Sequence, residues 1–440
     1  MAGPPADRRR AGLPRLVALD ALVACLEDRI SLDRALERDR RFGLLEARDR
    51  ALVHTVTTET CRRLGQIDAL IAASLERPLS ARARNVRAIL RLGIAQLLFL
   101  GFAPHAAIDS SVRLAHARAK GMAPLVNAVL RRLQREGRTM IAGQDPSMLN
   151  TPSWLYRSWR DAWGGATASA IARVNLERPE LDVTVVDDAE TWAARLGGRV
   201  LSTGSIRVPS AGVVRDLSGY ECGRWWVQDT AASFPARLLG DISGRRVLDL
   251  CAAPGGKTAQ LALAGARVTA VDVSGKRMER LQGNMERLGC TIETRIADAA
   301  TWRSPTPFDA VLLDAPCSGT GTIRRHPDIP WTRNQTDVRR LASLQRRMIA
   351  NALANLSGQG VLVYAACSIE LEEGEAHLNH LGHGCCIDAI HPDEVPGLEE
   401  AVTGEGCLRV LPTHLAREGG LDGFFVMRLR QSGEAGTSIV

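Results

Sequence analysis

A short stretch near the middle of the chain, residues 247–258, restricts the possible fold more than any other feature. It reads VLDLCAAPGGKT, an apolar run followed by Pro254, Gly255 and Gly256 and then by residues that favour a helix. This order is typical of a strand, a tight turn and a helix N-terminus. Glycine lets a ligand approach the backbone closely, and the free N–H groups of a helix start face that ligand. The stretch therefore predicts the floor of a nucleotide-type cofactor site.

Strands and helices alternate along the chain after residue 240. We expect strands at residues 247–250, 267–272, 291–297, 309–314, 360–366 and 424–429. We expect helices at residues 259–264, 276–288, 335–356 and 370–381. This order predicts a doubly wound, Rossmann-like α/β domain, which we place at residues 221–432. Its last strand can pair antiparallel at an edge of the sheet or between two neighbours.

The first third of the chain has a different pattern, in which apolar residues recur at helical spacing. One face comprises Val86, Ile89, Leu90, Gly93, Ile94 and Leu97, and a later one comprises Val126, Val129, Leu130 and Leu133. This periodicity predicts an all-α bundle over residues 1–140. Glycine and proline then mark a linker, and we expect a small mixed α/β module within residues 141–220. The small, polar residues 433–440 predict a disordered tail.

The charge is unevenly distributed between these parts. Residues 1–140 hold 25 Lys and Arg against 14 Asp and Glu, whereas the remainder holds 31 against 35. A basic first third favours an anionic partner, with nucleic acid the leading candidate and an ordinary solvated surface the alternative. Four aromatic residues within 154–163 lie among arginines, which suits either base stacking or a docking helix.

Composition restricts the class of protein further. A chain of 440 residues is expected to form two or three domains. It has no apolar stretch of 18 residues and no pattern of a secretory leader, so we expect no membrane partner. The ten cysteines lack the spacing of a small disulfide-bonded domain. These features predict a cytoplasmic protein with reduced thiols.

Acidic residues come where three successive strands end. Asp272 ends the second expected strand, Asp298 follows the third and Asp314 ends the fourth. All three would project from the carboxyl edge of the sheet, where open α/β folds bind ligands, although each alone is also a good turn residue. A ribose carboxylate beside a turn that needs no pyrophosphate suits S-adenosylmethionine. NAD is the competitor, but its dinucleotide fingerprint is missing.

Two cysteines follow apolar strands and can face the same crevice. Cys317 lies in DAPCSG after one strand, and Cys367 lies in YAACS after another. A metal site would need further Cys or His ligands, and only the distant His326 is available, so we expect no metal. The thiols instead suit a methyl donor and a pyrimidine, whose carbon 5 becomes nucleophilic once a thiolate adds to carbon 6.

The remaining steps of such a reaction have defined requirements. A carboxyl group at ring nitrogen 3 or the exocyclic amine would stabilise the charge that develops there. After methyl transfer the carbon 5 proton must leave and the thiol must be expelled, and the second thiol can assist. The base must also leave its stack to be reached.

Four motifs stand close to these residues: DLCAAPGGKT, DAPCSGTG, IRRHPDI followed by Trp331, and the Cys367-Ser368 pair. Together they resemble the Sun/RsmB (Fmu) family of 16S ribosomal RNA cytosine-5 methyltransferases. Residues 103–108 and 124–131 are similar to the NusB family, an all-helical RNA-binding fold. The resemblance implies a multidomain protein with a NusB-like N-terminal helical bundle, a small α/β RNA-binding module and a C-terminal S-adenosylmethionine-dependent methyltransferase domain.

The resemblance also implies a substrate and roles for individual residues. The substrate is a cytosine of 16S ribosomal RNA, DNA is not a partner, and we expect a monomer. Cys367 is the expected nucleophile and Cys317 the thiol that assists release, with Asp314 close to the target base. The cofactor is expected against Cys251, Ala252, Ala253, Pro254, Gly255, Gly256, Lys257, Asp272, Asp298 and Asp314. RNA contacts are expected at Arg324, Arg325 and His326.

Two positions depart from the family pattern. Ala366 stands beside the nucleophile where the family usually has threonine, and residues 372–375 read Glu-Glu-Gly-Glu instead of the common Glu-Asn-Glu. We place this acidic stretch at a helix start, where acids favour the helix dipole. Neither departure removes a reacting group.

Three alternative functions stay open at this point. A tRNA cytosine-5 methyltransferase has the same catalytic half, although the NusB-like front favours ribosomal RNA. A non-catalytic RNA-binding or assembly protein could retain the cofactor pocket. The presence of both cysteines and Asp314 argues against this alternative. A DNA-type cytosine-5 enzyme would attack with Cys317 and leave Cys367 without a role.

Overall fold

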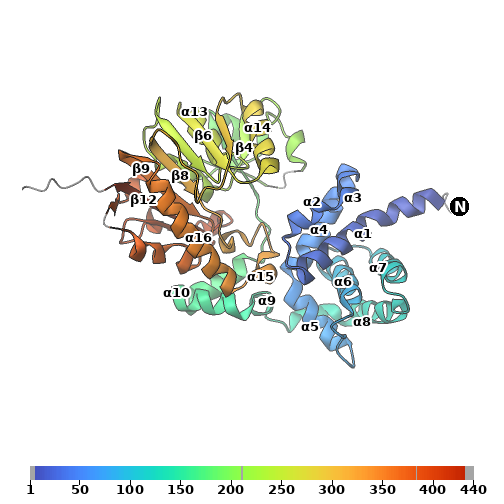
Figure 1. Ribbon diagram of the computed structural model, residues 1–440. Coiled ribbons are helices and arrows are strands. Elements are labelled where there is room, and N and C mark those ends of the chain that lie inside the picture. The colour runs from blue at the N-terminus through green and yellow to red at the C-terminus, as the bar shows by residue number, and fades with distance from the viewer. Residues whose placement is uncertain (1–4, 210–211, 383, 432–440) are drawn as a thin grey trace, which may run out of the picture. The chain divides into compact units, whose positions relative to one another are not determined.

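Two units of different architecture make up the structure, a computed structural model that describes residues 5–209, 212–382 and 384–431 (Figure 1). The first unit comprises the chain up to Glu177 together with Ile323–Asn334. The second comprises Arg178–Thr322 and the chain from Gln335 onward. The tail predicted at residues 433–440 lies outside the described residues. Within the described ranges, no helix has both the length and the apolar character that crossing a membrane requires.

The first unit is built from helices, as the apolar periodicity predicts. They are α1 (Pro5–Glu27), α2 (Leu32–Arg38), α3 (Arg40–Gly43), α4 (Ala47–Arg62), α5 (Leu64–Ser74), α6 (Arg84–Ile94), α7 (Pro104–Arg118), α8 (Ala123–Ala142), α9 (Pro146–Leu149), α10 (Ser153–Val174) and α15 (Ile329–Thr332). A π-helical turn, η1 (Ala95–Phe99), continues α6. The all-α prediction for the front of the chain is confirmed.

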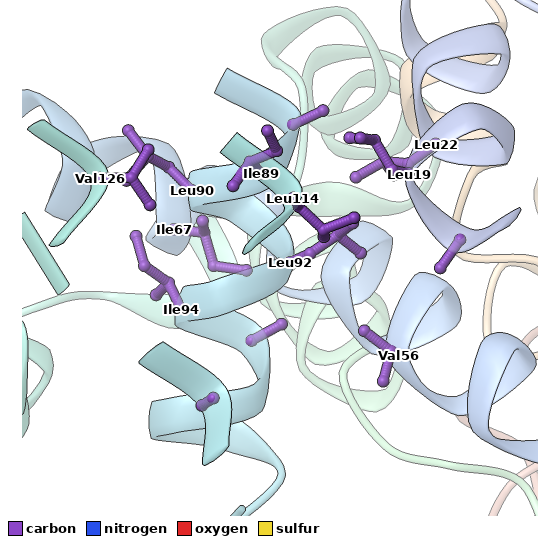
Figure 2. Close-up of a cluster of buried hydrophobic side chains, with 14 of the residues drawn as sticks. Leu19, Leu22, Val56, Ile67, Ile89, Leu90, Leu92, Ile94, Leu114 and Val126 are labelled. Atoms are coloured by element: carbon purple, nitrogen blue, oxygen red, sulfur yellow. The ribbon is translucent and has the colours of Figure 1, made fainter. Parts of the chain in front are cut away.

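The predicted apolar face of α6 lies in the core of this unit. Ile89, Leu90 and Ile94 are wholly buried. Figure 2 shows these side chains together with Leu114 of α7 and Val126 of α8. Each buried side chain of this size contributes about 1.5–3 kcal/mol relative to an exposed one. The helical spacing in the sequence therefore identified the core correctly.

The helical unit extends beyond the predicted boundary at residue 140. Helix α10 belongs to it, and the division falls after Glu177. The linker predicted around residue 145 is occupied by the end of α8 and by α9. Trp159, one of the four aromatic residues of α10, is only 1% exposed. Its burial favours a docking helix over base stacking for this ring.

The second unit contains a small antiparallel sheet with strand order β2-β3-β1-β4. Its elements are β1 (Leu181–Val185), α11 (Ala189–Leu196), β2 (Arg199–Val200), β3 (Ile206–Val208) and β4 (Trp225–Val227). A buried ion pair joins β1 to β3, with Arg207 Nε 2.6 Å from Asp182 Oδ1. The predicted mixed module is present, but the predicted range 141–220 is wrong at both ends, because the second unit starts at Arg178 and β4 lies beyond residue 220.

A larger sheet of eight strands follows, with the order β10-β12-β9-β8-β5-β6-β7 and β11 paired to β12. Its strands are β5 (Arg246–Leu250), β6 (Arg267–Asp272), β7 (Glu293–Ile296), β8 (Phe308–Asp314), β9 (Leu356–Ala366), β10 (Cys385–Ile387), β11 (Leu408–Val410) and β12 (Phe424–Gln431). The five neighbouring strands β9, β8, β5, β6 and β7 are parallel to one another. β12 pairs antiparallel with β9 and β10, so it lies between neighbours rather than at an edge.

Helices cover both faces of this sheet. They are α12 (Phe234–Arg237), α13 (Gly256–Leu263), α14 (Gly275–Leu288) and α16 (Gln335–Leu353). Successive residues of β5 face opposite sides, because Val247 packs with Leu261 of α13 whereas Leu248 packs with Met348 of α16. The doubly wound, Rossmann-like prediction is confirmed (Figure 1).

The prediction of a helix at residues 370–381 is wrong. The chain instead forms two short 3-10 turns, η5 (Leu371–Glu373) and η6 (Glu375–His380), separated by Gly374 at φ −134° and ψ −104°. The acidic stretch therefore does not begin an α-helix. The other short turns of this kind are η2 (Val214–Asp216), η3 (Ala231–Ser233), η4 (Thr320–Thr322), η7 (Pro392–Glu394), η8 (Glu399–Ala401) and η9 (Ala416–Glu418).

Candidate functional site

The glycine turn lies between β5 and α13, as the sequence predicts. Gly255 has φ +104°, a conformation that L side chains rarely adopt, and a Cβ there would lie 3.0 Å from Leu281 Cγ. Cys251, at the start of the turn, has φ +63° and is also in the left-handed region. Helix α13 begins at Gly256, so its first N–H groups are presented at the carboxyl edge of the sheet. Gly255 thus gives the turn its left-handed backbone and lets Leu281 and Met285 of α14 pack closely against it.

Asp249 supports this turn from β5, and sequence reasoning missed it. Its carboxyl group is wholly buried and accepts a hydrogen bond from Thr258 Oγ1 at 2.6 Å. Burial raises the pKa of Asp249 to about 7, against the opposing effect of the Thr258 hydrogen bond. The contact ties the first turn of α13 to β5. An acidic residue within an otherwise apolar strand is the signal that could have identified it.

Asp272 ends β6 and lies directly against the glycine turn. Its Oδ2 accepts a hydrogen bond from Ala253 N at 3.3 Å, and its Oδ1 accepts one from Ser274 N at 3.0 Å. Arg277 Nη1 lies 3.3 Å from Oδ2, and Arg277 also donates to the Ala253 carbonyl. Asp272 itself is buried, and Arg277 is half-exposed. The structure thus brings this predicted carboxylate to the turn, next to a cationic side chain that the sequence did not indicate.

Asp298 follows β7 at the same edge of the sheet and is exposed. Its Oδ1 accepts a hydrogen bond from Ala300 N at 2.9 Å, which is a turn contact. This geometry agrees with the ordinary role of aspartate in a turn, and its exposed position leaves the side chain accessible to a ligand.

Asp314 ends β8 and pairs with the lysine of the glycine turn. Lys257 Nζ lies 2.8 Å from Asp314 Oδ2. The lysine side chain is largely buried, and its ammonium group also lies 5.2 Å from the centre of the Phe424 ring. The pair therefore joins the glycine turn to the strand that leads to Cys317, which the two separate motifs in the sequence could not show.

Carboxyl groups gather at the glycine turn, and two of them pair with Lys257 and Arg277. Burial raises the pKa of the Cys251 thiol, and the nearby charges of Asp314, Asp272 and Asp249 raise it further. Asp314, Asp272 and Asp249 therefore all lie close to Cys251 at the start of the turn. S-adenosylmethionine carries a positive sulfonium and an ammonium group, which suit this set, whereas the pyrophosphate of NAD is an anion. The residues present fit S-adenosylmethionine.

Two exposed apolar side chains extend the same edge and were also missed. Val273 is 70% exposed and Ile296 is 65% exposed. They lie at the ends of adjacent parallel strands, because Asp272 pairs with Ile296 in the β6–β7 register. Large exposed apolar side chains at a ligand-binding edge suit the flat face of a purine. A valine directly after the strand-end aspartate was the available signal.

The two predicted thiols meet. Cys317 Sγ and Cys367 Sγ are 3.3 Å apart, although the residues lie on loops after different strands, β8 and β9. The hydrogen bond to Cys367, together with burial, raises the pKa of Cys317. Either thiol can donate at this distance, and a protonated Cys317 can donate toward a Cys367 thiolate. No group of three His, Cys, Asp or Glu side chains that could hold a metal ion occurs within the described ranges.

Backbone contacts hold the two cysteine loops against each other. Gly321 N donates to the Cys367 carbonyl at 3.1 Å, and Ile369 N donates to Thr320 Oγ1 at 3.2 Å. Ala366, directly before Cys367, is wholly buried in β9 and pairs with Phe425 of β12. Hydrogen bonds between the two loops therefore hold the facing thiols in place.

The basic residues predicted to contact RNA lie in the helical unit, within Ile323–Asn334. Arg324 is only 2% exposed, and its carbonyl accepts a hydrogen bond from Arg62 Nη1 at 2.9 Å. Arg324 is therefore buried within the helical unit, and its contact with RNA stays a prediction. Arg325 is half-buried, whereas His326 is exposed with its Nδ1 3.4 Å from Asp33 Oδ2.

Comparison with known proteins decides the family. The family model described as "16S rRNA methyltransferase RsmB/F" matches residues 236–430, and that of the NusB family matches residues 13–135. Ribosomal RNA small subunit methyltransferase B of Pseudomonas putida is 37% identical over 94% of this chain and 98% of its own length. The protein of the same name from Sodalis glossinidius is 35% identical over 96% and 98%.

The chain belongs to the ribosomal RNA small subunit methyltransferase B family. As a member of this family it is an S-adenosylmethionine-dependent methyltransferase, and the predicted family, enzyme class and cofactor are confirmed. A solved structure described as the crystal structure of PH0851 has the same fold, with a TM-score of 0.71, 22% identity and coverage of 98% of this chain and 99% of that one. The ribosomal RNA small subunit methyltransferase B family thus accounts for both units.

Proposed function

We propose that this protein transfers a methyl group from S-adenosylmethionine to carbon 5 of a cytosine in 16S ribosomal RNA through a covalent adduct of Cys367. The observation that carries this proposal is the pair of thiols, 3.3 Å apart, beside the strand that ends at Asp314. One thiol alone would suit many cysteine enzymes. Two facing thiols at the cofactor edge suit addition to a pyrimidine ring and the later release of the product.

Each residue has a defined chemical task in this reaction. Cys367 Sγ adds as a thiolate to carbon 6, and the hydrogen bond from the Cys317 thiol stabilises that thiolate. Carbon 5 then carries electron density and takes the methyl group that bound S-adenosylmethionine supplies. Asp314, held by Lys257, faces the charge that develops on the base at nitrogen 3 or its exocyclic amine.

Release of the product restores the starting state of the thiols. Water takes the proton from carbon 5, and the electron pair of that C–H bond forms the double bond between carbons 5 and 6. The bond from carbon 6 to Cys367 Sγ breaks with its electron pair left on sulfur. The Cys317 thiol again donates to this thiolate, so the raised pKa of Cys317 keeps it in the form that assists release.

The helical unit supports RNA as the substrate. Residues 1–140 carry an excess of Lys and Arg, and residues 13–135 match the NusB family. Phosphate contacts by such a basic unit would place the RNA without reading its sequence. The named relatives act on small-subunit ribosomal RNA, which favours 16S RNA over tRNA for this chain, with the cytoplasm as the place of reaction.

Mapping 5-methylcytosine in 16S RNA and tRNA from cells with and without this protein tests the proposal. We expect one or a few cytosines of 16S RNA to lose the methyl group in its absence, and a Cys367→Ala protein not to restore it. Loss confined to tRNA would instead support the tRNA enzyme. No change in either RNA would support an assembly protein without catalysis.

A further inference from the structure

A buried polar cluster lies behind the two thiols, where the residues that follow each cysteine meet. We call Ser318, Thr320, Ser368 and Glu373 the seryl–glutamate cluster. Ser318 Oγ lies 3.2 Å from Ser368 Oγ, and Thr320 Oγ1 lies 3.2 Å from the same atom. All four side chains are buried. The cluster therefore connects the Cys317 loop to the Cys367 loop through side-chain hydrogen bonds.

Glu373 is the acceptor on which this cluster depends. Its Oε1 accepts hydrogen bonds from Ser318 N at 2.8 Å and from Gln345 Nε2 at 3.1 Å. Its Oε2 accepts one from Ser318 Oγ at 2.5 Å. Burial raises the pKa of Glu373, and the hydrogen bonds from Ser318 and Ser368 oppose that shift. A carboxyl group with no exposed surface but several donors is held in one position.

The surroundings of Glu373 are equally fixed. Tyr364 OH donates to the Glu373 carbonyl at 2.8 Å. Gln345, which donates to the Glu373 side chain, also donates to the Pro316 carbonyl at 3.0 Å, directly before Cys317. His377 Nε2 lies 3.0 Å from Gln345 Oε1. The Cys317 loop is thus held on both sides of the cysteine by groups that converge on Glu373.

Glu375, two residues after Glu373, supports the other cysteine loop. Arg409 forms a two-pronged ion pair with Glu375, with Nη2 2.6 Å from Oε2, and its Nη1 donates to the Ser368 carbonyl at 2.6 Å. Gly374 lies between the two acids, and a Cβ there would collide with Arg409 Nη2. Glu373 and Glu375 therefore support the two cysteine loops and do not begin an α-helix.

We propose that Glu373 is a positioning residue for product release: by fixing Ser318 against Ser368, it keeps the Cys317 thiol in hydrogen-bond contact with the Cys367 sulfur. This inference rests on the proposed covalent chemistry. Glu373 touches neither sulfur atom in the hydrogen bonds above, so it acts through the loops. Without it, the leaving thiolate of Cys367 loses its donor, and the covalent adduct persists.

Glutamine offers a sharp test because it keeps the shape and the hydrogen bonds of Glu373 while removing the charge. Its Oε1 can accept from Ser318 N and Gln345, and its amide can donate to Ser318 Oγ, whose oxygen also accepts. Alanine removes all of these contacts. Glu372→Ala is the matched control, because Glu372 contacts Gln335 Nε2 at 2.7 Å, outside the cluster.

The experiment uses the full chain, unmodified 16S RNA transcribed in vitro and labelled S-adenosylmethionine. It measures turnover, the fraction of protein trapped on RNA in a denaturing gel, and the affinity for S-adenosylmethionine by calorimetry. We expect Glu373→Ala to slow turnover about tenfold and to raise the trapped fraction, with unchanged cofactor affinity. We expect Glu373→Gln to restore most of the turnover and Glu372→Ala to match the wild type.

Three results would overturn the inference. The first is a Glu373→Ala variant whose turnover and trapped fraction equal those of the wild type. The second is a Glu373→Gln variant that is as slow as Glu373→Ala, because the reaction would then require the charge or the proton of Glu373. If Glu373→Ala does not fold, the Ser318→Ala variant is measured instead. The third contradicting result is a Ser318→Ala protein whose fraction trapped on RNA equals that of the wild type. A wild-type protein that forms neither adduct nor 5-methylcytosine would refute the proposed function itself.

Discussion

Asp249 provides a test of the cofactor turn that needs no substrate. In the folded protein burial raises its pKa to about 7, whereas an unfolded aspartate has a pKa of about 3.9. Below both values the carboxyl group is protonated in both states. As pH rises between them, the unfolded chain releases its proton while the folded chain keeps it, so stability falls. A difference of about 3 units corresponds to about 4 kcal/mol, all of it lost by about pH 8.

Asp249→Asn removes this titration but can still accept the hydrogen bond of Thr258 Oγ1, which is 2.6 Å long in the wild type. We therefore expect the stability of the variant relative to the wild type to increase with pH, by up to about 4 kcal/mol between about pH 4 and pH 8. Urea unfolding, monitored by the fluorescence change of the second unit across this range, measures the difference. Asp241→Asn, at an exposed aspartate of the same unit, is the control.

The opposite slope would refute the reasoning. If the wild type gained stability relative to Asp249→Asn as pH rises, the folded protein would favour the ionised carboxylate, and burial would not dominate at this position. A pH-independent difference would mean that Asp249 titrates alike in the folded and unfolded chains. Either result would show that burial does not control the ionisation of Asp249 in the folded protein.

Three further predictions concern other contacts. Lys257→Met removes the partner of Asp314, and we expect single-turnover methylation to slow about 100-fold, measured with labelled cofactor; an unchanged rate contradicts the role of the pair. Gly374→Ala forces a Cβ against Arg409 and should cost about 1–3 kcal/mol, measured by denaturant unfolding, whereas wild-type stability would show that Arg409 can move freely. Trp331→Ala removes a packed ring whose Nε1 donates to the Cys61 carbonyl at 2.9 Å. We expect the free energy of unfolding of the helical unit to fall by about 3 kcal/mol, seen as a thermal transition at lower temperature. A transition at the wild-type temperature would contradict this expectation.

Features encoded by local sequence could be predicted well. The glycine turn, the strand-end carboxylates and both cysteines follow from the order of apolar runs, glycines and polar residues within about ten positions. The apolar face of α6 was identifiable because a helix repeats every 3.6 residues. The facing of Cys317 and Cys367 could be anticipated because parallel strands end at one edge.

Features that depend on contacts between distant segments could not be predicted. The burial of Arg324 results from its packing beside Arg62, far away along the chain, and no local pattern separates it from an exposed arginine. The acidic stretch had the composition of a helix start, but Arg409 and the two cysteine loops determine its conformation. The unit boundary after Glu177 likewise depends on where α10 packs.

The covalent adduct tests the central claim most directly. The full chain is mixed with unmodified 16S RNA and labelled S-adenosylmethionine, and the protein–RNA complex that survives denaturation is quantified for the wild type, Cys367→Ala and Cys317→Ala. We predict no adduct and no methyl transfer for Cys367→Ala, and an adduct that accumulates for Cys317→Ala, because its leaving thiolate lacks the donor 3.3 Å away. An adduct that persists in Cys367→Ala and disappears in Cys317→Ala would reverse the two roles and contradict this mechanism.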